Sequence, residues 1–197
     1  MTSFNELLQE VYAVTNRPDL ISESKMAIKA ATLKAHQSDF YSKDIYEQYV
    51  TLGDESSYLW SLDYISLISN LRSFKYVRKL DPEGTPGDFI TILSPEEVLD
   101  TYGASRQDIA YVAGRILEIK SSTEINTCLL AAYVNPIVAE GSYSSWVADL
   151  YPYVIVFEAA RVLFKTIGYD EQSAAYNQLV GEQYQILRTN ALPDQAS

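Results

Sequence analysis

The stretch "DLYPYVIVFEAARVLFKTIGYDEQSAAYNQLVGEQYQILRTN", residues 149–190, decides the fold, because its pattern predicts two consecutive helices. The first predicted helix has one narrow polar stripe, formed by Glu158, Arg161 and Lys165 at spacings of three and four residues. Apolar residues cover the rest of that helix: Val154, Ile155, Val156, Phe157, Val162, Leu163, Phe164 and Ile167. We therefore expect the first helix to be buried nearly all round.

A tight turn joins the two predicted helices. Gly168 can adopt the left-handed conformation that ends a helix, and Asp170 can cap the next helix by accepting a hydrogen bond from a free amide. The resulting helical hairpin contains no reactive motif. It indicates a role in assembly rather than in catalysis.

The N-terminal residues predict two more helices. Ser3 and Glu6 have the spacing of a capping box, and the apolar residues that follow recur on one face of a helix over residues 4–14. Pro18 then interrupts the helical hydrogen bonds.

The second of these helices is predicted over residues 22–37. We expect Met26, Ala30 and Leu33 to face inward, and Lys25, Lys29 and His36 to share another side of the helix. These three residues form the one basic stripe that we expect in an acidic protein. They are candidates for a partner interface, although simple solvation also explains them.

Between residues 42 and 136 the pattern changes to period two, which predicts a largely antiparallel β-rich insertion. Ser94, Pro95 and the following glutamates predict a short helix over residues 95–102, and another is expected over 142–150. The candidate strands are "DIYEQYVTL", "YLWSLDY", "RSFKYVRKL", "FITIL", two runs that pivot at Gly114, and "TCLLAAYVNP". The predicted fold class is α+β: a bundle of N- and C-terminal helices (1–41 and 137–190) with the β-rich region inserted, and a short tail over 191–197.

Composition limits the possible functions. The chain has 197 residues, suits one domain and contains no apolar run long enough to cross a bilayer; its first residues predict a helix rather than a signal peptide. We therefore expect it to act in the compartment where it is made. The formal net charge of -11 argues against a protein that grips a nucleic-acid backbone. A negative charge of this size keeps a protein soluble. It would also repel the DNA backbone and so keep DNA from adhering to a surface that it passes.

Residues suited to chemistry are few. The single histidine, His36, shares a predicted helix face with lysines, and the adjacent Glu96 and Glu97 are explained by the helix dipole. The single cysteine, Cys128, is expected to be a buried apolar residue of a strand. We predict no catalytic, cofactor-binding or metal-binding residues. The sixteen tyrosines suit either half-buried strands or surfaces that contact a partner.

Several phrases of the sequence resemble one family. They are "FNELLQEVYAVTNRPDL", "AIKAATLKAHQSDFYSKD", "YLWSLD", "FKYVRKLD", "FITILSPEEVLDTYG" and the C-terminal helical hairpin. Together they span nearly the whole chain and are similar to the head-to-tail adaptor proteins, or connectors, of tailed double-stranded DNA bacteriophages.

This resemblance implies a helical bundle that carries a β-rich extension. It also implies a subunit of a dodecameric ring that docks beneath the portal, prolongs the DNA channel and offers a platform to tail nozzle or tail-tube proteins. DNA would pass without sequence-specific binding, and no membrane would be involved. The protein would be made in the host cytoplasm and would act in the neck of the virion.

Interface residues expected for such a ring are Lys25, Lys29, His36, Glu158, Arg161, Lys165, Leu187 and Leu192. The basic stripe would meet an acidic face of a neighbouring subunit or of the portal. Three alternatives stay open: a tail terminator or nozzle subunit of the same neck, a cellular ligand-binding or regulatory domain, and an enzyme.

Overall fold

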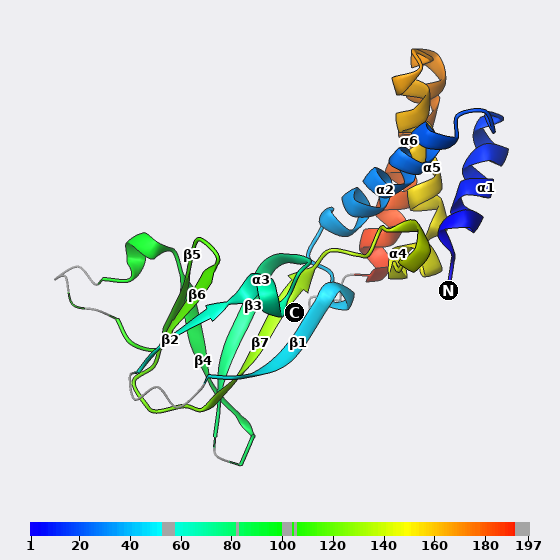
Figure 1. Cartoon of the computed structure of the whole chain (residues 1–197). Coiled ribbons are helices and arrows are strands. Elements are labelled where there is room, and N and C mark those ends of the chain that lie inside the picture. Colours follow the sequence, from blue (N-terminus) through cyan, green and yellow to red (C-terminus); the bar gives the residue numbers. More distant parts are fainter. Residues whose placement is uncertain (53–57, 82, 100–103, 105, 192–197) are drawn as a thin grey trace. The chain divides into compact units, whose positions relative to one another are not determined.

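The computed structural model describes residues 1–52, 58–81, 83–99, 104 and 106–191 of the chain. These residues form two compact units: residues 1–44 with 135–191, which are mainly helical, and the described residues of 45–134, which form a sheet. Figure 1 shows that helices from both ends of the chain build one unit and that the strands build the other. This is the predicted α+β organisation, with the β-rich region inserted between N- and C-terminal helices.

The helical unit contains two N-terminal helices, α1 (Phe4–Thr15) and α2 (Ile21–Gln37), and three C-terminal helices, α4 (Trp146–Leu150), α5 (Pro152–Thr166) and α6 (Asp170–Ala191). The predicted capping box forms at the start of α1, where Glu6 N–H donates to Ser3 Oγ and Ser3 N–H donates to the Glu6 carboxylate. The predicted turn between α5 and α6 also forms, with Gly168 at φ +81°.

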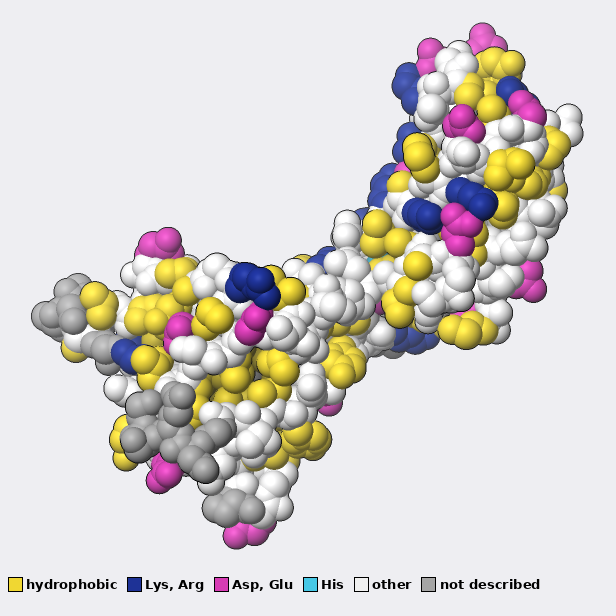
Figure 2. Space-filling view, in the orientation of Figure 1, with side chains coloured by type: hydrophobic (Ala, Val, Ile, Leu, Met, Phe, Trp, Pro, Cys, Tyr) yellow, Lys and Arg dark blue, Asp and Glu magenta, His cyan; other side chains and the backbone are white. Residues whose placement is uncertain are grey.

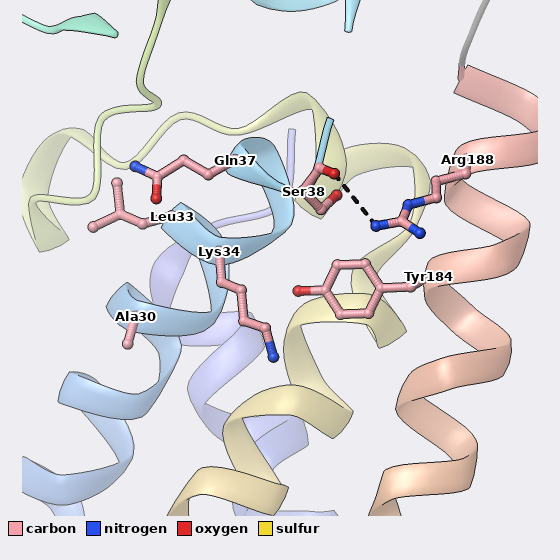
Figure 3. A pocket seen from close by; sticks show the side chains of 7 residues that line it. All are labelled: Ala30, Leu33, Lys34, Gln37, Ser38, Tyr184 and Arg188. Carbon is pink, nitrogen blue, oxygen red and sulfur yellow. Dashed lines mark hydrogen bonds between the residues drawn. The ribbon is translucent and has the colours of Figure 1, made fainter. Parts of the chain in front are cut away.

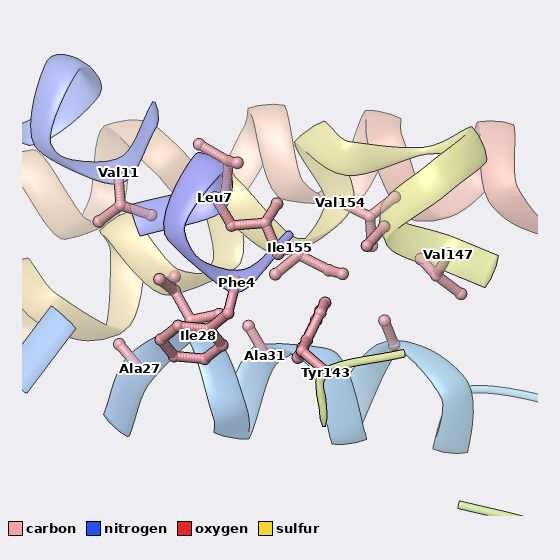
Figure 4. Packing of buried hydrophobic residues seen from close by; sticks show 14 of the residues in the cluster. Phe4, Leu7, Val11, Ala27, Ile28, Ala31, Tyr143, Val147, Val154 and Ile155 are labelled. Carbon is pink, nitrogen blue, oxygen red and sulfur yellow. The ribbon is translucent and has the colours of Figure 1, made fainter. Parts of the chain in front are cut away.

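Helix α5 lies against α1, α2, α4 and α6, and its apolar residues form the centre of the helical core. Figure 4 shows side chains of α1, α2 and α5 converging there, among them Phe4, Leu7, Ile28 and Ile155. The prediction that α5 is buried nearly all round is confirmed. This chain's own helices cover most of its surface, so neighbouring subunits are not needed to bury it.

The face of α2 that enters this core differs from the predicted one. Met26 is 68% exposed and Ala30 is also exposed, whereas Ile28 is fully buried. The other buried α2 residues are mostly small: Ser24, Ala27, Ala31, Thr32 and Ala35. Small side chains let α2 approach α5 closely, and a prediction that favours large apolar residues therefore selects the opposite face.

The sheet unit contains seven strands in the order β1-β7-β3-β4-β5-β6-β2. Neighbouring strands are antiparallel except for β4 and β5, which are parallel. The strands are β1 (Ile45–Thr51), β2 (Leu59–Asp63), β3 (Leu71–Leu80), β4 (Pro86–Leu93), β5 (Ile109–Ala113), β6 (Ile116–Lys120) and β7 (Thr127–Val134), and a short helix α3 (Tyr64–Leu67) follows β2. Each predicted strand is present, and β5 and β6 turn at Gly114 as expected, with φ +64°.

A separate core lies against one face of this sheet. Trp60, Val77, Leu117 and Leu130 are among its buried residues, and Cys128 is buried in β7 as predicted. Of the helix expected over 95–102, the described residues form only a 3-10 turn at Pro95–Glu97, with the predicted cap at Ser94; residues 100–102 lie outside the described part. Similarly, the helix expected over 142–150 is shorter and begins at Trp146.

Candidate interaction surfaces

The side chain of His36 lies inside the helical unit and not on a basic surface stripe. It is 2% exposed, and its Nδ1 lies 2.6 Å from Asp44 Oδ1 while its Nε2 lies 2.9 Å from Ser145 Oγ. Trp146 Nε1 donates a second hydrogen bond to Asp44 Oδ1, at 2.7 Å. The expectation that His36 shares an exposed face with Lys25 and Lys29 is therefore wrong. On α2, His36 points toward the segment 139–146, which packs against that helix.

The contacts run from aspartate to histidine to serine, the order of a serine hydrolase triad. Asp44 and Ser145 are each only 4% exposed, so all three side chains are enclosed. Ser145 Oγ also accepts a hydrogen bond from Ala148 N–H, and thereby caps α4. We interpret the cluster as a structural network that joins the end of the N-terminal segment to the start of α4.

Lys25 and Lys29 bind a carboxylate of their own chain. Their Nζ atoms lie 2.7 Å and 3.2 Å from the two oxygens of Glu140, whose pKa is lowered by these hydrogen bonds. Both lysines remain about one-third exposed. Their role in binding a partner stays a prediction, and any partner carboxylate would compete with Glu140.

The predicted polar stripe of α5 is also engaged inside the chain. Glu158 is 1% exposed; Arg161 binds both of its oxygens at 2.8 and 3.0 Å, and Lys34 Nζ lies 2.7 Å from Oε1. Burial raises the pKa of Glu158, but hydrogen bonds from Arg161 and Lys34 outweigh it and leave that pKa below its usual value. Lys165 instead binds Asp170 across the α5–α6 turn.

The two remaining candidates have different positions. Leu187 is fully buried in the helical core, so its own chain covers it and it is not available to a partner. Leu192 lies outside the described residues. The sequence-based list of interface residues thus includes several that stabilise the helical unit itself.

A groove of about 490 Å³ lies between α2 and α6. Figure 3 shows Lys34 from α2 and Tyr184 and Arg188 from α6 extending toward one another there. Lys34 Nζ lies 5.6 Å from the centre of the Tyr184 ring, and Arg188 donates a hydrogen bond to the carbonyl oxygen of Ser38. Burial raises the pKa of Tyr184 well above its usual range, so this phenol stays neutral.

One face of the sheet unit carries exposed aromatic side chains. Tyr49, Leu129, Arg78 and Phe89 are successive partners across β1, β7, β3 and β4, and their side chains therefore share a face. Tyr49 is 62% exposed and Phe89 60%, and the Arg78 guanidinium lies 4.6 Å from the centre of the Phe89 ring. Tyr76, in the next register position, packs edge-on against Phe89. Tyrosine, phenylalanine and arginine are typical of protein interfaces.

Neither a protein family model nor a curated protein sequence matches the chain. The functional argument therefore rests on the chain's own residues.

Figure 2 shows hydrophobic side chains on the surface of both units, interspersed with charged ones. In the described part of the chain, no helix is long and apolar enough to cross a membrane, and no three His, Cys, Asp or Glu residues are grouped to hold a metal ion.

Sequence reasoning missed Asp44, Ser145 and Trp146, which hold His36 in place. Asp44 is eight residues from His36 and Ser145 is 109 residues away, so no local motif links them. Ser145 could have been recognised only as a helix cap, because a serine three residues before a helical amide, here that of Ala148, is a common N-cap.

Proposed function

We propose that the protein is a head-to-tail adaptor subunit of a tailed double-stranded DNA bacteriophage. The observation that supports this proposal is the chain organisation: N- and C-terminal helices form one core, and residues 45–134 form an inserted, mostly antiparallel sheet. The sequence resemblance implies the same arrangement, a helical bundle with a β-rich extension.

In this proposal the subunits form a dodecameric ring by repeated heterologous contacts, in which one surface of a subunit meets a different surface of the next. The ring docks on the portal and extends the DNA channel. The net charge of -11 suits this role, because an acidic lining repels the DNA backbone and lets it slide. The protein acts in the virion neck, after synthesis in the host cytoplasm, without enzymatic turnover or a cofactor.

The aromatic face of the sheet unit suits the attachment of tail nozzle or tail-tube proteins. Tyr49 and Phe89 are large, rigid and exposed, and Arg78 stacks on Phe89. Side chains of these types contribute much of the binding energy in protein interfaces.

Native mass spectrometry with purified portal tests the proposal. We expect the 22.2 kDa chain to bind the portal as a closed set of identical subunits. A ring that ignores the portal but caps a tail tube would favour the tail-terminator alternative. A chain that stays monomeric with portal present would contradict the adaptor function.

A further inference from the structure

The groove between α2 and α6 contains a hydroxyl group that forms no hydrogen bond with the described residues. This group is Tyr184 Oη, which extends from α6 toward α2 and is shielded from solvent. Burial raises the pKa of Tyr184 above its usual range, so the neutral phenol keeps a proton to donate. Buried polar groups in folded proteins are normally paired. The unpaired hydroxyl is therefore suited to an acceptor from another molecule.

Arg188 lies one helical turn beyond Tyr184 and lines the same groove. Within the described part of the chain its guanidinium pairs with no carboxylate, and it donates a hydrogen bond of 3.3 Å to the carbonyl oxygen of Ser38. Further N–H donors of this planar group are left over, in the geometry that binds a carboxylate through two parallel hydrogen bonds. Helix α6 thus offers adjacent donors on one wall of the groove. On the other wall, Ala30 and Leu33 of α2 supply apolar surface.

The charges near the groove favour a ligand group with a single negative charge. Three cations lie near it, Lys34, Arg161 and Arg188, together with two carboxylates, Glu158 and Asp39. The groove therefore keeps a small positive excess in a protein whose formal net charge is -11. One carboxylate matches this excess, whereas a doubly charged phosphate would exceed it.

Lys34 can turn away from Glu158 without leaving that carboxylate unpaired. The lysine side chain is 53% exposed, and its Nζ lies 2.7 Å from Glu158 Oε1. Arg161 binds both oxygens of the same carboxylate, so Glu158 keeps a bidentate partner when the lysine turns. Figure 3 shows Lys34 beside the Tyr184 phenol, and its Nζ lies 5.6 Å from the centre of that ring. A turn of Lys34 toward a ligand would uncover the hydroxyl and add a second cation beside Arg188.

We infer that this groove binds an acidic segment of a partner protein, in which a carboxylate lies next to an apolar side chain. The carboxylate accepts hydrogen bonds from Arg188 and from Tyr184 Oη. Its apolar neighbour lies against Ala30 and Leu33. The groove has a volume of about 490 Å³, and several residues that line it are exposed, so it suits a protein segment better than a small ligand, which needs an enclosing pocket. The inference goes beyond the adaptor function, since it rests on these residues alone.

NMR titration of the ¹⁵N-labelled full-length protein tests this site. The probe is a blocked peptide, acetyl-Gly-Leu-Glu-Leu-Gly-amide, and the matched control peptide has glutamine in place of the glutamate. The acidic peptide should shift the Nε–H signal of Arg188 and the amide signals of Lys34 and Ser38, with a dissociation constant of about 1 mM or lower. The control peptide should bind about tenfold more weakly or worse, because it lacks the charge that strengthens the hydrogen bonds.

Two variants test the donors separately. Tyr184→Phe removes only the hydroxyl and should weaken binding of the acidic peptide by about 5- to 10-fold. Because that hydroxyl forms no hydrogen bond with the described residues, the melting temperature should not fall. Arg188→Gln should weaken binding by about tenfold or more. The matched control is Arg115→Gln, which removes an equal charge from a side chain of the sheet unit that is 66% exposed, and it should leave binding unchanged.

Three results would overturn the inference. The first is equal binding of the two peptides, or unchanged binding of the acidic peptide to Tyr184→Phe. The second is a shift of the Arg188 signal with protein concentration alone, which would mean that a second copy occupies the groove. The third is stronger peptide binding by Asp194→Asn, which would mean that the chain's own C-terminal residues compete for it. The titration contains no portal, so its failure leaves the adaptor function in place, and failure of the portal experiment leaves the groove in place.

Discussion

Asp44 Oδ1 accepts hydrogen bonds from both His36 and Trp146, at 2.6 and 2.7 Å. Asp44 is the last residue of the helical unit before β1, so these bonds fix the end of the N-terminal segment to the rest of that unit. The His36 and Trp146 rings also meet edge-on, with centroids 5.4 Å apart. The network joins residues from three places in the sequence: the end of α2, the 3-10 turn at Ser42–Asp44 and the start of α4.

Replacing Asp44 with alanine should destabilise the protein strongly. The change leaves two buried N–H groups without their acceptor, which costs about 2 kcal/mol or more. Urea unfolding of the purified variant measures the loss. Glu171→Ala, an exposed carboxylate on α6, serves as the control and should stay within about 0.5 kcal/mol of the original protein. An equally small effect for Asp44→Ala would show that the network is not structural.

Glu158→Gln should cost about 1 to 3 kcal/mol near pH 7, because Arg161 and Lys34 lose a buried anionic partner. The folded-state pKa of Glu158 is lowered below its unfolded value of about 4.3, so its contribution is complete above that pH and disappears as pH falls through the folded pKa. The difference in unfolding free energy between the two proteins should therefore be constant from pH 7 to about 5 and shrink below about 4. A difference that grows in acid would contradict this.

Two glycines near and within α6 should respond in opposite ways to alanine. Gly168 has φ +81°, a conformation that costs an alanine about 1 kcal/mol, whereas Gly181 lies inside the helix with open space around its Cα. Gly168→Ala should lower the melting temperature, and Gly181→Ala should raise it. Each substitution should change the unfolding free energy by about 0.5 to 1 kcal/mol. Calorimetry of both variants checks the signs, and a shift in the same direction for both would refute the assignment of the turn.

The strands were predictable because most of them are rich in β-branched and aromatic residues and lie between turn residues such as Gly114. Helix boundaries were also readable where a cap is local, as for Ser3 and Glu6. The burial of α5 followed from its apolar circumference. In these cases the deciding interaction lies within a few residues along the chain.

The orientation of α2 and the surroundings of His36 were not predictable in the same way. Helix α2 has small residues on its buried side and Met26 and Leu33 on its exposed or half-exposed side, so its apolar pattern favours the wrong face. The sequence pattern places His36 on a solvated or partner-facing side of α2, because its partners Asp44 and Ser145 approach it only in the folded unit.

Tyr49→Ala combined with Phe89→Ala should weaken binding of a tail nozzle or tail-tube protein by roughly 5- to 30-fold, as expected when interface aromatic side chains are removed. Both side chains are exposed, so the unfolding free energy should change little. Isothermal titration calorimetry with the tail protein measures the affinity. Tyr58→Ala removes another tyrosine that is 56% exposed, outside this face, and should leave binding intact. Equal losses for both variants would argue against the aromatic face.

Electron microscopy of the purified protein with purified portal tests the adaptor function most directly. The account predicts a ring of identical subunits, with the symmetry of a dodecamer, stacked coaxially on the portal with an open channel along the shared axis. A protein that remains monomeric beside intact portal particles would contradict it.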